Sequence, residues 1–172
     1  QIPSTKRGCK GQMESRVEQA CRNCTNIKNR QTKARDNALE TIESLIEERQ
    51  LLKNKILVIQ LDEKYTIDKN LTGLIANQLM AKYQRPVLLL NKPYYDMSLT
   101  SVEGEPILPT RTAVSWDGSG RGYDKSKFDN LREFLNDSNL VMYAEGHANA
   151  LGVGITDLLF DQFIAYSNAF KD

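Results

Sequence analysis

The sequence predicts an α/β fold, with a roughly five-stranded mixed sheet flanked by helices and preceded by one long N-terminal helix. Three features support this prediction: an uninterrupted helical stretch at the start, a strand–helix–strand unit in the middle, and short apolar strands beside glycine-rich segments toward the end. A chain of 172 residues can bury a substantial core. We expect a basic linker region over residues 1–53 and an α/β domain over residues 54–172.

The first expected element is a helix of unusual length. Residues 12–52 contain neither proline nor glycine, and apolar or small residues recur every seven positions with others three positions later. At a rise of 1.5 Å per residue, such a helix runs on the order of 60 Å. Gln31 and several alanines weaken its apolar seam, so a helix connecting two domains fits at least as well as a coiled coil.

The middle of the chain has the pattern of a β–α–β unit. Residues 55–61 and 85–91 are apolar runs typical of buried strands, and residues 70–80 between them predict a helix with Asn70 as its N-cap. A connection of this length implies that the two strands are parallel.

The remainder of the sequence predicts shorter elements separated by turns. In order, we expect a loop or edge hairpin over residues 93–110, a strand over 110–116, a turn over 117–122, a helix over 127–136, a strand over 140–144, a glycine-rich turn over 146–154 and a last helix with Ile155, Leu158, Leu159, Phe163 and Phe170 on its apolar face.

Charge is unevenly distributed along the chain. Residues 1–35 carry nine Lys/Arg and two Asp/Glu, whereas the rest of the chain carries 14 Lys/Arg and 20 Asp/Glu. The basic arm predicts contact with a polyanion or, alternatively, an ordinary solvated helix face.

The three cysteines, Cys9, Cys21 and Cys24, all lie in this basic arm. They are too few for a four-ligand zinc site, which favours reduced thiols and a cytoplasmic location. No apolar run reaches the roughly 20 residues of a membrane span. Because the chain does not begin with methionine, we expect it to be part of a longer protein.

Two glycine-rich segments that follow predicted strands are the candidate binding site. A turn that leads into a helix leaves unpaired backbone N–H groups, which favour anions; a plain structural turn is the alternative. Arg121 can bind a phosphate through two N–H groups, and His147 and Asn149 can add hydrogen bonds. The candidate phosphate-binding residues are Gly118, Ser119, Gly120, Arg121, Gly146, His147, Asn149 and Gly152.

Aromatic residues in or beside these segments can either stack on bases or pack in the core. They are Tyr94, Tyr95, Trp116 and Tyr123. Catalytic and metal-ligating residues are not expected in this chain, because it has a single histidine and its carboxylates are scattered.

Residues 145–152, Glu-Gly-His-Ala-Asn-Ala-Leu-Gly, resemble the Gly-Gly-His-x-x-Ala-Ala-Gly motif of the DHH-associated domain, the C-terminal substrate-binding half of DHH phosphoesterases. Gly118-Ser119-Gly120-Arg121 is similar to that family's Gly-Ser-x-Arg-Ser turn. Residues 72–76 and 83–90 resemble its RecJ branch, and the long basic helix is similar to the helix that joins the two domains there. The resemblance covers residues 55–167 best.

Three residues depart from the family pattern. Glu145 replaces the first glycine, Leu151 the second alanine, and Gly122 the serine after the arginine. A carboxylate at position 145 would repel a phosphate unless it points away, and Gly122 removes a hydroxyl donor. The family's Asp-His-His cluster is absent from these 172 residues.

The resemblance implies the C-terminal, substrate-binding part of a RecJ-like 5′-to-3′ single-stranded DNA exonuclease. The implied partners are single-stranded DNA and a DHH catalytic domain, which would hold the Mn or Mg ions. Two alternatives stay open: a phosphodiesterase of the same superfamily acting on nanoRNA or a cyclic dinucleotide, and a nucleic-acid-binding module without enzymatic activity.

Overall fold

The computed structural model describes residues 1–65, 67–92 and 115–170, which form two compact units, Gln1–Glu40 and Thr41–Asp172. The loop expected over residues 93–110 and most of the strand expected over 110–116 lie outside the described residues. The division expected at residue 53 remains a prediction.

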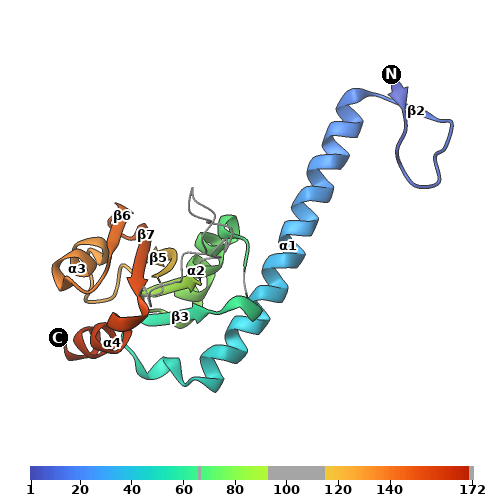
Figure 1. Ribbon diagram of the computed structural model, residues 1–172. Coiled ribbons are helices and arrows are strands. Elements are labelled where there is room, and N and C mark those ends of the chain that lie inside the picture. The colour runs from blue at the N-terminus through green and yellow to red at the C-terminus, as the bar shows by residue number, and fades with distance from the viewer. Residues whose placement is uncertain (66, 93–114, 171–172) are drawn as a thin grey trace, which may run out of the picture. The chain divides into compact units, whose positions relative to one another are not determined.

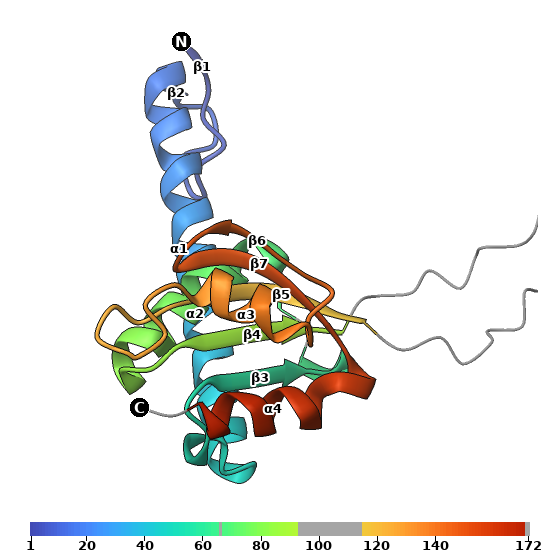
Figure 2. The same ribbon diagram turned by 90° about the vertical axis from the view of Figure 1, so that its left-hand side faces the viewer.

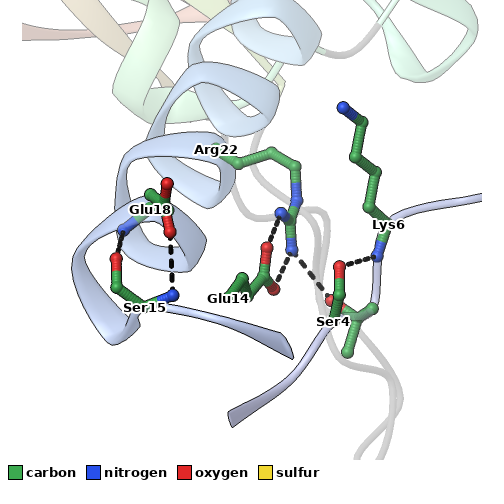
Figure 3. A network of polar contacts seen from close by, with 7 residues as sticks. Ser4, Lys6, Glu14, Ser15, Glu18 and Arg22 are labelled. Atoms are coloured by element: carbon green, nitrogen blue, oxygen red, sulfur yellow. Dashed lines mark hydrogen bonds and ion pairs between the residues drawn. The ribbon is translucent and has the colours of Figure 1, made fainter. Parts of the chain in front are cut away.

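The N-terminal unit contains a two-stranded antiparallel ribbon, β1 (Ile2–Pro3) and β2 (Met13–Glu14), followed by the start of α1 (Arg16–Glu48). A capping box begins the helix: the Ser15 backbone N–H donates to Glu18 (2.8 Å), and the Glu18 N–H donates to the Ser15 hydroxyl (3.1 Å; Figure 3). The helix therefore has a defined first residue.

An ion pair joins the ribbon to the helix. The Arg22 guanidinium donates to both carboxylate oxygens of Glu14, and Nη2 lies 2.7 Å from Oε1 (Figure 3). This hydrogen bonding lowers the pKa of Glu14 and raises that of Arg22. The ribbon, which the sequence analysis did not predict, is thus attached to the second turn of α1.

The expected long helix is present as α1, with 33 residues. Its N-terminal part is largely exposed, including Val17 and Ile27 of the predicted seam, whereas Ile42, Leu45 and Ile46 are buried in the second unit. A short 3₁₀ turn, η1 (Leu51–Lys53), follows.

The second unit is built on the expected five-stranded mixed sheet, with strand order β3-β4-β5-β7-β6. The pair β3–β4 is parallel, as the β–α–β pattern predicts, and the other pairs are antiparallel. The strands are β3 (Leu57–Leu61), β4 (Val87–Asn91), β5 (Ser115–Arg121), β6 (Tyr143–His147) and β7 (Ala150–Thr156).

Helices cover both faces of this sheet (Figures 1 and 2). On one face, α3 (Leu131–Ser138) and α4 (Phe160–Ala169) pack over an apolar core that includes Leu88, Val153 and Phe163. On the other face, α2 (Lys69–Tyr83) lies against β4 and β5. Two 3₁₀ turns, η2 (Glu63–Tyr65) and η3 (Asp157–Leu159), precede α2 and α4. None of the helices described is both long and apolar enough to cross a bilayer.

Helix boundaries differ from the sequence prediction at several points, and α1 itself is shorter at both ends than the 12–52 stretch. The N-cap of α2 is Asp68, whose carboxylate accepts from the Asn70 N–H (2.9 Å), and not Asn70 itself. The helix expected from residue 127 begins at Leu131, because the Asn130 side chain caps Glu133 N–H. Ile155 belongs to β7, so the last helix starts only at Phe160.

The two glycine-rich segments are strands, which corrects the prediction of turns. Residues 117–121 lie within β5, paired on both sides by β4 and β7. Residues 146–154 form the tip and second strand of the β6–β7 hairpin, and the strand expected over residues 140–144 runs over 143–147. A hairpin, and not a strand–turn–helix, therefore carries the histidine, and Gly154 lies inside β7, which ends at Thr156 before η3 and α4 begin.

Candidate anion-binding face

The predicted site residues lie on three neighbouring strands. In the antiparallel register, Ser119 is opposite Gly152, and Gly152 is opposite Glu145 on the next strand. Because paired residues project from the same side of a sheet, alternate residues of β5, β7 and β6 share one face, on the α2 side. We call this the open face. Its members are Asp117, Ser119, Arg121, Tyr143, Glu145, His147, Ala150, Gly152 and Gly154.

Glycine keeps part of the open face flat. A Cβ at Gly152 would have no neighbour closer than 3.9 Å, so the backbone there is accessible and unfilled. Tyr143, Glu145 and His147 on the edge strand β6 are exposed. A flat surface of peptide groups beside side-chain donors suits the close approach of a phosphodiester backbone.

Arg121 is the cation of this face. Its guanidinium Nη1 donates to the Gly120 carbonyl (2.7 Å) and lies over α2 at Gly73, where an added Cβ would fall 2.5 Å from Nη2. Burial lowers the pKa of this group, and within residues 1–65, 67–92 and 115–170 no carboxylate pairs with it. A partly buried cation without a counter-ion favours a bound anion.

Ser119 and Thr72 extend the site toward the start of α2. Their hydroxyl oxygens are 3.0 Å apart, and the Thr72 hydroxyl also donates to the Lys69 carbonyl (2.8 Å). The sequence predicts Ser119 as a site residue but not Thr72 and Lys69. Both lie at the start of a predicted helix, where backbone N–H groups are left unpaired.

A pocket of about 240 Å³ lies at this end of α2, beyond the carboxyl ends of the parallel strands β3 and β4. The Asn91 side-chain oxygen is buried and has no hydrogen-bond partner in the part of the chain that the structure describes. The pocket is lined by Lys69, Thr72, Asn91, Asp117, Gly118, Ser119 and Tyr143.

Tyr143 and Asp117 form the wall of this pocket. The Tyr143 hydroxyl donates to Asp117 Oδ1 (2.9 Å), and burial together with this hydrogen bond raises the pKa of Tyr143 to about 12. The Tyr143 phenol therefore stays neutral near neutral pH and remains a hydrogen-bond donor to Asp117.

Gly118 and Gly120 face the opposite side of β5, toward the core. A Cβ at Gly120 would lie 3.0 Å from the Leu151 side chain, and a Cβ at Gly118 would overlap the Leu89 carbonyl oxygen of β4. These two glycines allow tight packing between strands. The sequence predicts that they bind phosphate, but they lie on the side of β5 opposite the open face.

Asn149 holds the hairpin to a neighbouring loop. Its side-chain oxygen accepts from the Leu131 N–H (3.2 Å), and its NH₂ group donates to the Asp129 carbonyl (3.1 Å) and to Asp124 (3.3 Å). The amide is therefore occupied within the chain, and Gly122 packs directly against it.

Arg132 makes a second connection to the hairpin. It donates to the carbonyls of Gly146 (2.8 Å, side chain) and Ala148 (3.0 Å, backbone). Gly146 has φ +122°, a conformation that favours glycine. His147 is exposed near the hairpin tip, so the structure places it on the open face, separated from Arg121 by strand β7.

None of the four aromatic candidates is placed on the open face by the described part of the structure. Trp116 packs edge-on against Phe160 in the core, with ring centroids 6.0 Å apart, so its ring is not on the open face. Tyr123 is half-buried in the loop after β5, and Tyr94 and Tyr95 lie outside the described residues.

The residues of the open face do not fit a divalent metal centre. In the ranges that the structure describes, no three His, Cys, Asp or Glu side chains gather closely enough to hold an ion. His147 stands apart, and the Asp117 carboxylate accepts from Tyr143 and from the Ser115 hydroxyl (3.3 Å).

No family model matches the chain. Two curated relatives are each 36% identical over 156 residues, which is 90% of this chain: the "Putative SPbeta prophage-derived single-strand DNA-specific exonuclease YorK" of Bacillus subtilis (strain 168) and the "Putative single-strand DNA-specific exonuclease yorK" of Bacillus phage SPbeta. These relatives confirm the resemblance to a single-strand DNA-specific exonuclease. The chain spans about a quarter of their length, 24%.

Solved structures of RecJ overlap the chain more loosely. RecJ from Thermus thermophilus in complex with Mg²⁺ is 18% identical, with a TM-score of 0.49, covering 86% of this chain and 20% of that one. An exonuclease RecJ bound to manganese is also 18% identical, with a TM-score of 0.48, covering 86% and 31%.

Proposed function

We propose that this chain is the substrate-binding, C-terminal part of a RecJ-like exonuclease that hydrolyses single-stranded DNA, and that its open face holds the phosphate backbone. The observation that carries the proposal is the half-buried Arg121 guanidinium, which has no carboxylate partner among the described residues. The two 36% identical relatives, named as single-strand DNA-specific exonucleases, supply the substrate class.

The arrangement supports binding that does not depend on base sequence. Arg121 offers a forked pair of donors to one phosphate, and the Ser119 hydroxyl, on the same face of β5, can exchange its contact with Thr72 for a phosphate oxygen. Phosphate contacts fix the position of a strand and carry no sequence information, as an exonuclease requires.

Glu145 opposes this binding. It pairs with Gly152, which pairs with Ser119, so its carboxylate lies on the open face two strands from the proposed phosphate contacts, roughly 10 Å away at the usual strand spacing. At that distance in water the repulsion of a phosphate is about 0.4 kcal/mol, or roughly a twofold loss of affinity. We therefore expect Glu145 to weaken the site without abolishing it.

Bond cleavage is assigned to residues outside this chain. A metal-binding DHH domain in the parent protein would supply Mn or Mg and the activated water. The purified chain with Mn²⁺ should release no nucleotides from a labelled oligonucleotide, and metal-dependent cleavage by it would refute this division of labour. A cytoplasmic location belongs to the same proposal and can be tested by cell fractionation.

The binding test is a fluorescence anisotropy titration of a labelled dT oligonucleotide at several salt concentrations. Arg121→Ala should weaken binding about tenfold, the loss of one charge-assisted forked contact, and reduce the salt slope by about 0.7, the value for one phosphate on single-stranded DNA. Arg121→Lys should bind the oligonucleotide with an affinity between those of the parent chain and Arg121→Ala. Glu145→Gln should bind about twice as tightly as the parent chain.

The control is Lys64→Ala, which removes one charge near the far edge strand β3. An equal loss of affinity in Lys64→Ala and Arg121→Ala would mean that net charge, and not the open face, governs binding. Competition by a dinucleotide as strong as by the oligonucleotide would instead favour the small-substrate phosphodiesterase.

A further inference from the structure

A second pocket, of about 370 Å³, lies where β3 and β4 begin. Four segments far apart in the sequence line it: the start of β3, the link from α2 to β4, the loop after β5, and Phe170 after α4. Five of its lining residues are cations and none is acidic; they are Lys53, Lys55, Arg85, Lys125 and Lys127. We call this the basic pocket.

Arg85 is held in place by backbone oxygens. Its Nη1 donates to the carbonyls of Leu52 and Asn54, both at 2.8 Å, and Nε lies 3.5 Å from the Tyr83 carbonyl. Carbonyls fix the guanidinium without cancelling its charge. Nη2 has no partner in residues 1–65, 67–92 and 115–170, so two N–H groups remain for an anion.

Lys53 and Lys125 add positive charge that carboxylates do not neutralise. The Lys53 ammonium donates to the neutral Gln50 side chain, and Lys125 is exposed, with no partner in the described part of the chain. Lys55 donates to the Phe170 carbonyl (2.5 Å), and both Lys55 and Lys127 have further partners within the chain. A ligand is therefore assigned to Lys53, Arg85 and Lys125.

An aromatic ring lies beside these cations. Phe170 stacks on the buried ring of Phe128, with centroids 5.3 Å apart and planes 29° from parallel, yet 38% of Phe170 is exposed. A fixed aromatic surface next to a cationic group is the combination that holds one nucleotide of a single strand, phosphate on the cations and base on the ring.

We propose that the basic pocket binds a nucleotide of single-stranded nucleic acid, with its phosphate on Arg85, Lys53 and Lys125 and its base against Phe170. The proposal deepens, and rests on, the proposed function. Arg121 is in register with Val87, the residue after Pro86, which lines the pocket. Arg121 therefore lies at the same end of the sheet as the basic pocket, and one nucleic-acid strand can contact both.

The first test measures binding of a labelled dT oligonucleotide to the full 172-residue chain carrying Lys125→Glu. We expect at least a fivefold loss of affinity and a salt slope smaller by about 0.7, one phosphate contact on a single strand. Lys64→Glu is the matched control, with the same charge reversal outside the pocket, and should change affinity less than twofold. Equal effects of the two variants would overturn the proposal.

The second test isolates the base contact. Phe170→Leu preserves an apolar group against Phe128 and removes the ring, so the variant should fold. The parent chain should bind a dT oligonucleotide several-fold more tightly than an abasic oligonucleotide of equal length, and Phe170→Leu should bind the two more nearly equally. Unchanged discrimination in the variant would exclude Phe170 as the base contact and refute this half of the assignment.

A third measurement separates this proposal from the proposed function. Thymidine monophosphate, titrated into isotope-labelled protein, should shift the NMR signals of the Arg85 Nε–H and the Lys125 amide, whether or not long DNA binds. Shifts with no oligonucleotide binding would support the pocket and sink the proposed function. Loss of oligonucleotide binding in Arg121→Ala, with no shifts of the pocket signals, would support the proposed function and refute the basic pocket as a nucleotide site.

Discussion

Replacing Asn149 with alanine should destabilise the protein, because the structure uses this amide to hold the hairpin tip to the loop before α3. The side chain bonds to the Leu131 N–H, the Asp129 carbonyl and the Asp124 carboxylate. Leu131 is fully buried, so its N–H would lose its partner in a place that water does not readily reach. The sequence predicts instead that Asn149 contacts substrate.

The size of the effect follows from these three hydrogen bonds. A buried N–H left without a partner costs about 1–3 kcal/mol, and an ordinary hydrogen bond contributes about 1 kcal/mol net. Asn149→Ala should therefore lower the free energy of unfolding by about 2–4 kcal/mol. For a chain of this size that corresponds to a fall in Tm of about 5–15 °C.

Urea unfolding followed by circular dichroism measures this change, with His147→Ala as the control. The His147 side chain is exposed two residues away and makes no hydrogen bond with any described residue, so its removal should change stability by less than about 0.5 kcal/mol. If Asn149→Ala unfolded like the parent chain but bound the dT oligonucleotide less well, the amide would face the ligand and the structural interpretation would be wrong.

Two further predictions test the glycine packing and the N-terminal unit. Gly118→Ala should lower the free energy of unfolding in urea by at least about 3 kcal/mol, because its Cβ would overlap the Leu89 carbonyl oxygen. Gly152→Ala should change that free energy by less than about 1 kcal/mol, because no atom lies within 3.9 Å of the added Cβ. Similar losses of stability in the two variants would contradict the faces assigned to these glycines. The pKa values of Glu14 and Glu18 are lowered from 4.5, so the stabilisation that they give is complete above pH 4.5 and is lost as pH falls through their folded pKa values. Carbon-13 chemical shifts of residues 15–22 should therefore report loss of helix below that pH. Glu18→Gln should weaken this dependence of helicity on pH. Helicity that stays constant far into the acid range would show that neither carboxylate stabilises the start of the helix.

The β–α–β unit and the long helix could be predicted because local sequence alone specifies them. The runs before and after α2 are predominantly apolar, as strands buried on both faces require, and both strands are buried except at their one polar residue each, Gln60 and Asn91. The start of α1 also had a local signal, the Ser15-x-x-Glu18 capping box, which the sequence analysis did not use.

The glycine-rich strands could not be predicted, because long-range pairing holds them as strands. Glycine disfavours strands when it is considered alone, and Asp117-Gly118-Ser119-Gly120 has the composition of a turn. In the folded chain, β5 lies between β4 and β7, and every residue from Asp117 to Arg121 has a partner on both sides. Tertiary contacts overrode local preference.

The strand structure changes the physical basis of the predicted anion site. At a helix N-terminus, the attraction would come from unpaired N–H groups and the helix dipole. In β5 and β7 the backbone N–H groups are largely used by strand pairing, so the attraction must come from side chains, above all Arg121.

The glycines then contribute space. Gly120 of β5 faces the core and lets Leu151 and Leu88 pack closely, while Gly152 of β7 leaves the other side without bulk at its position; the surface over Gly154 is covered by Tyr143 and Asp117. A phosphate backbone could therefore approach the sheet beside Arg121 without meeting branched side chains on β7. Gly152→Trp fills that surface, so it should reduce oligonucleotide binding far more than it reduces stability. Anisotropy and urea titrations of this one variant would separate the two effects.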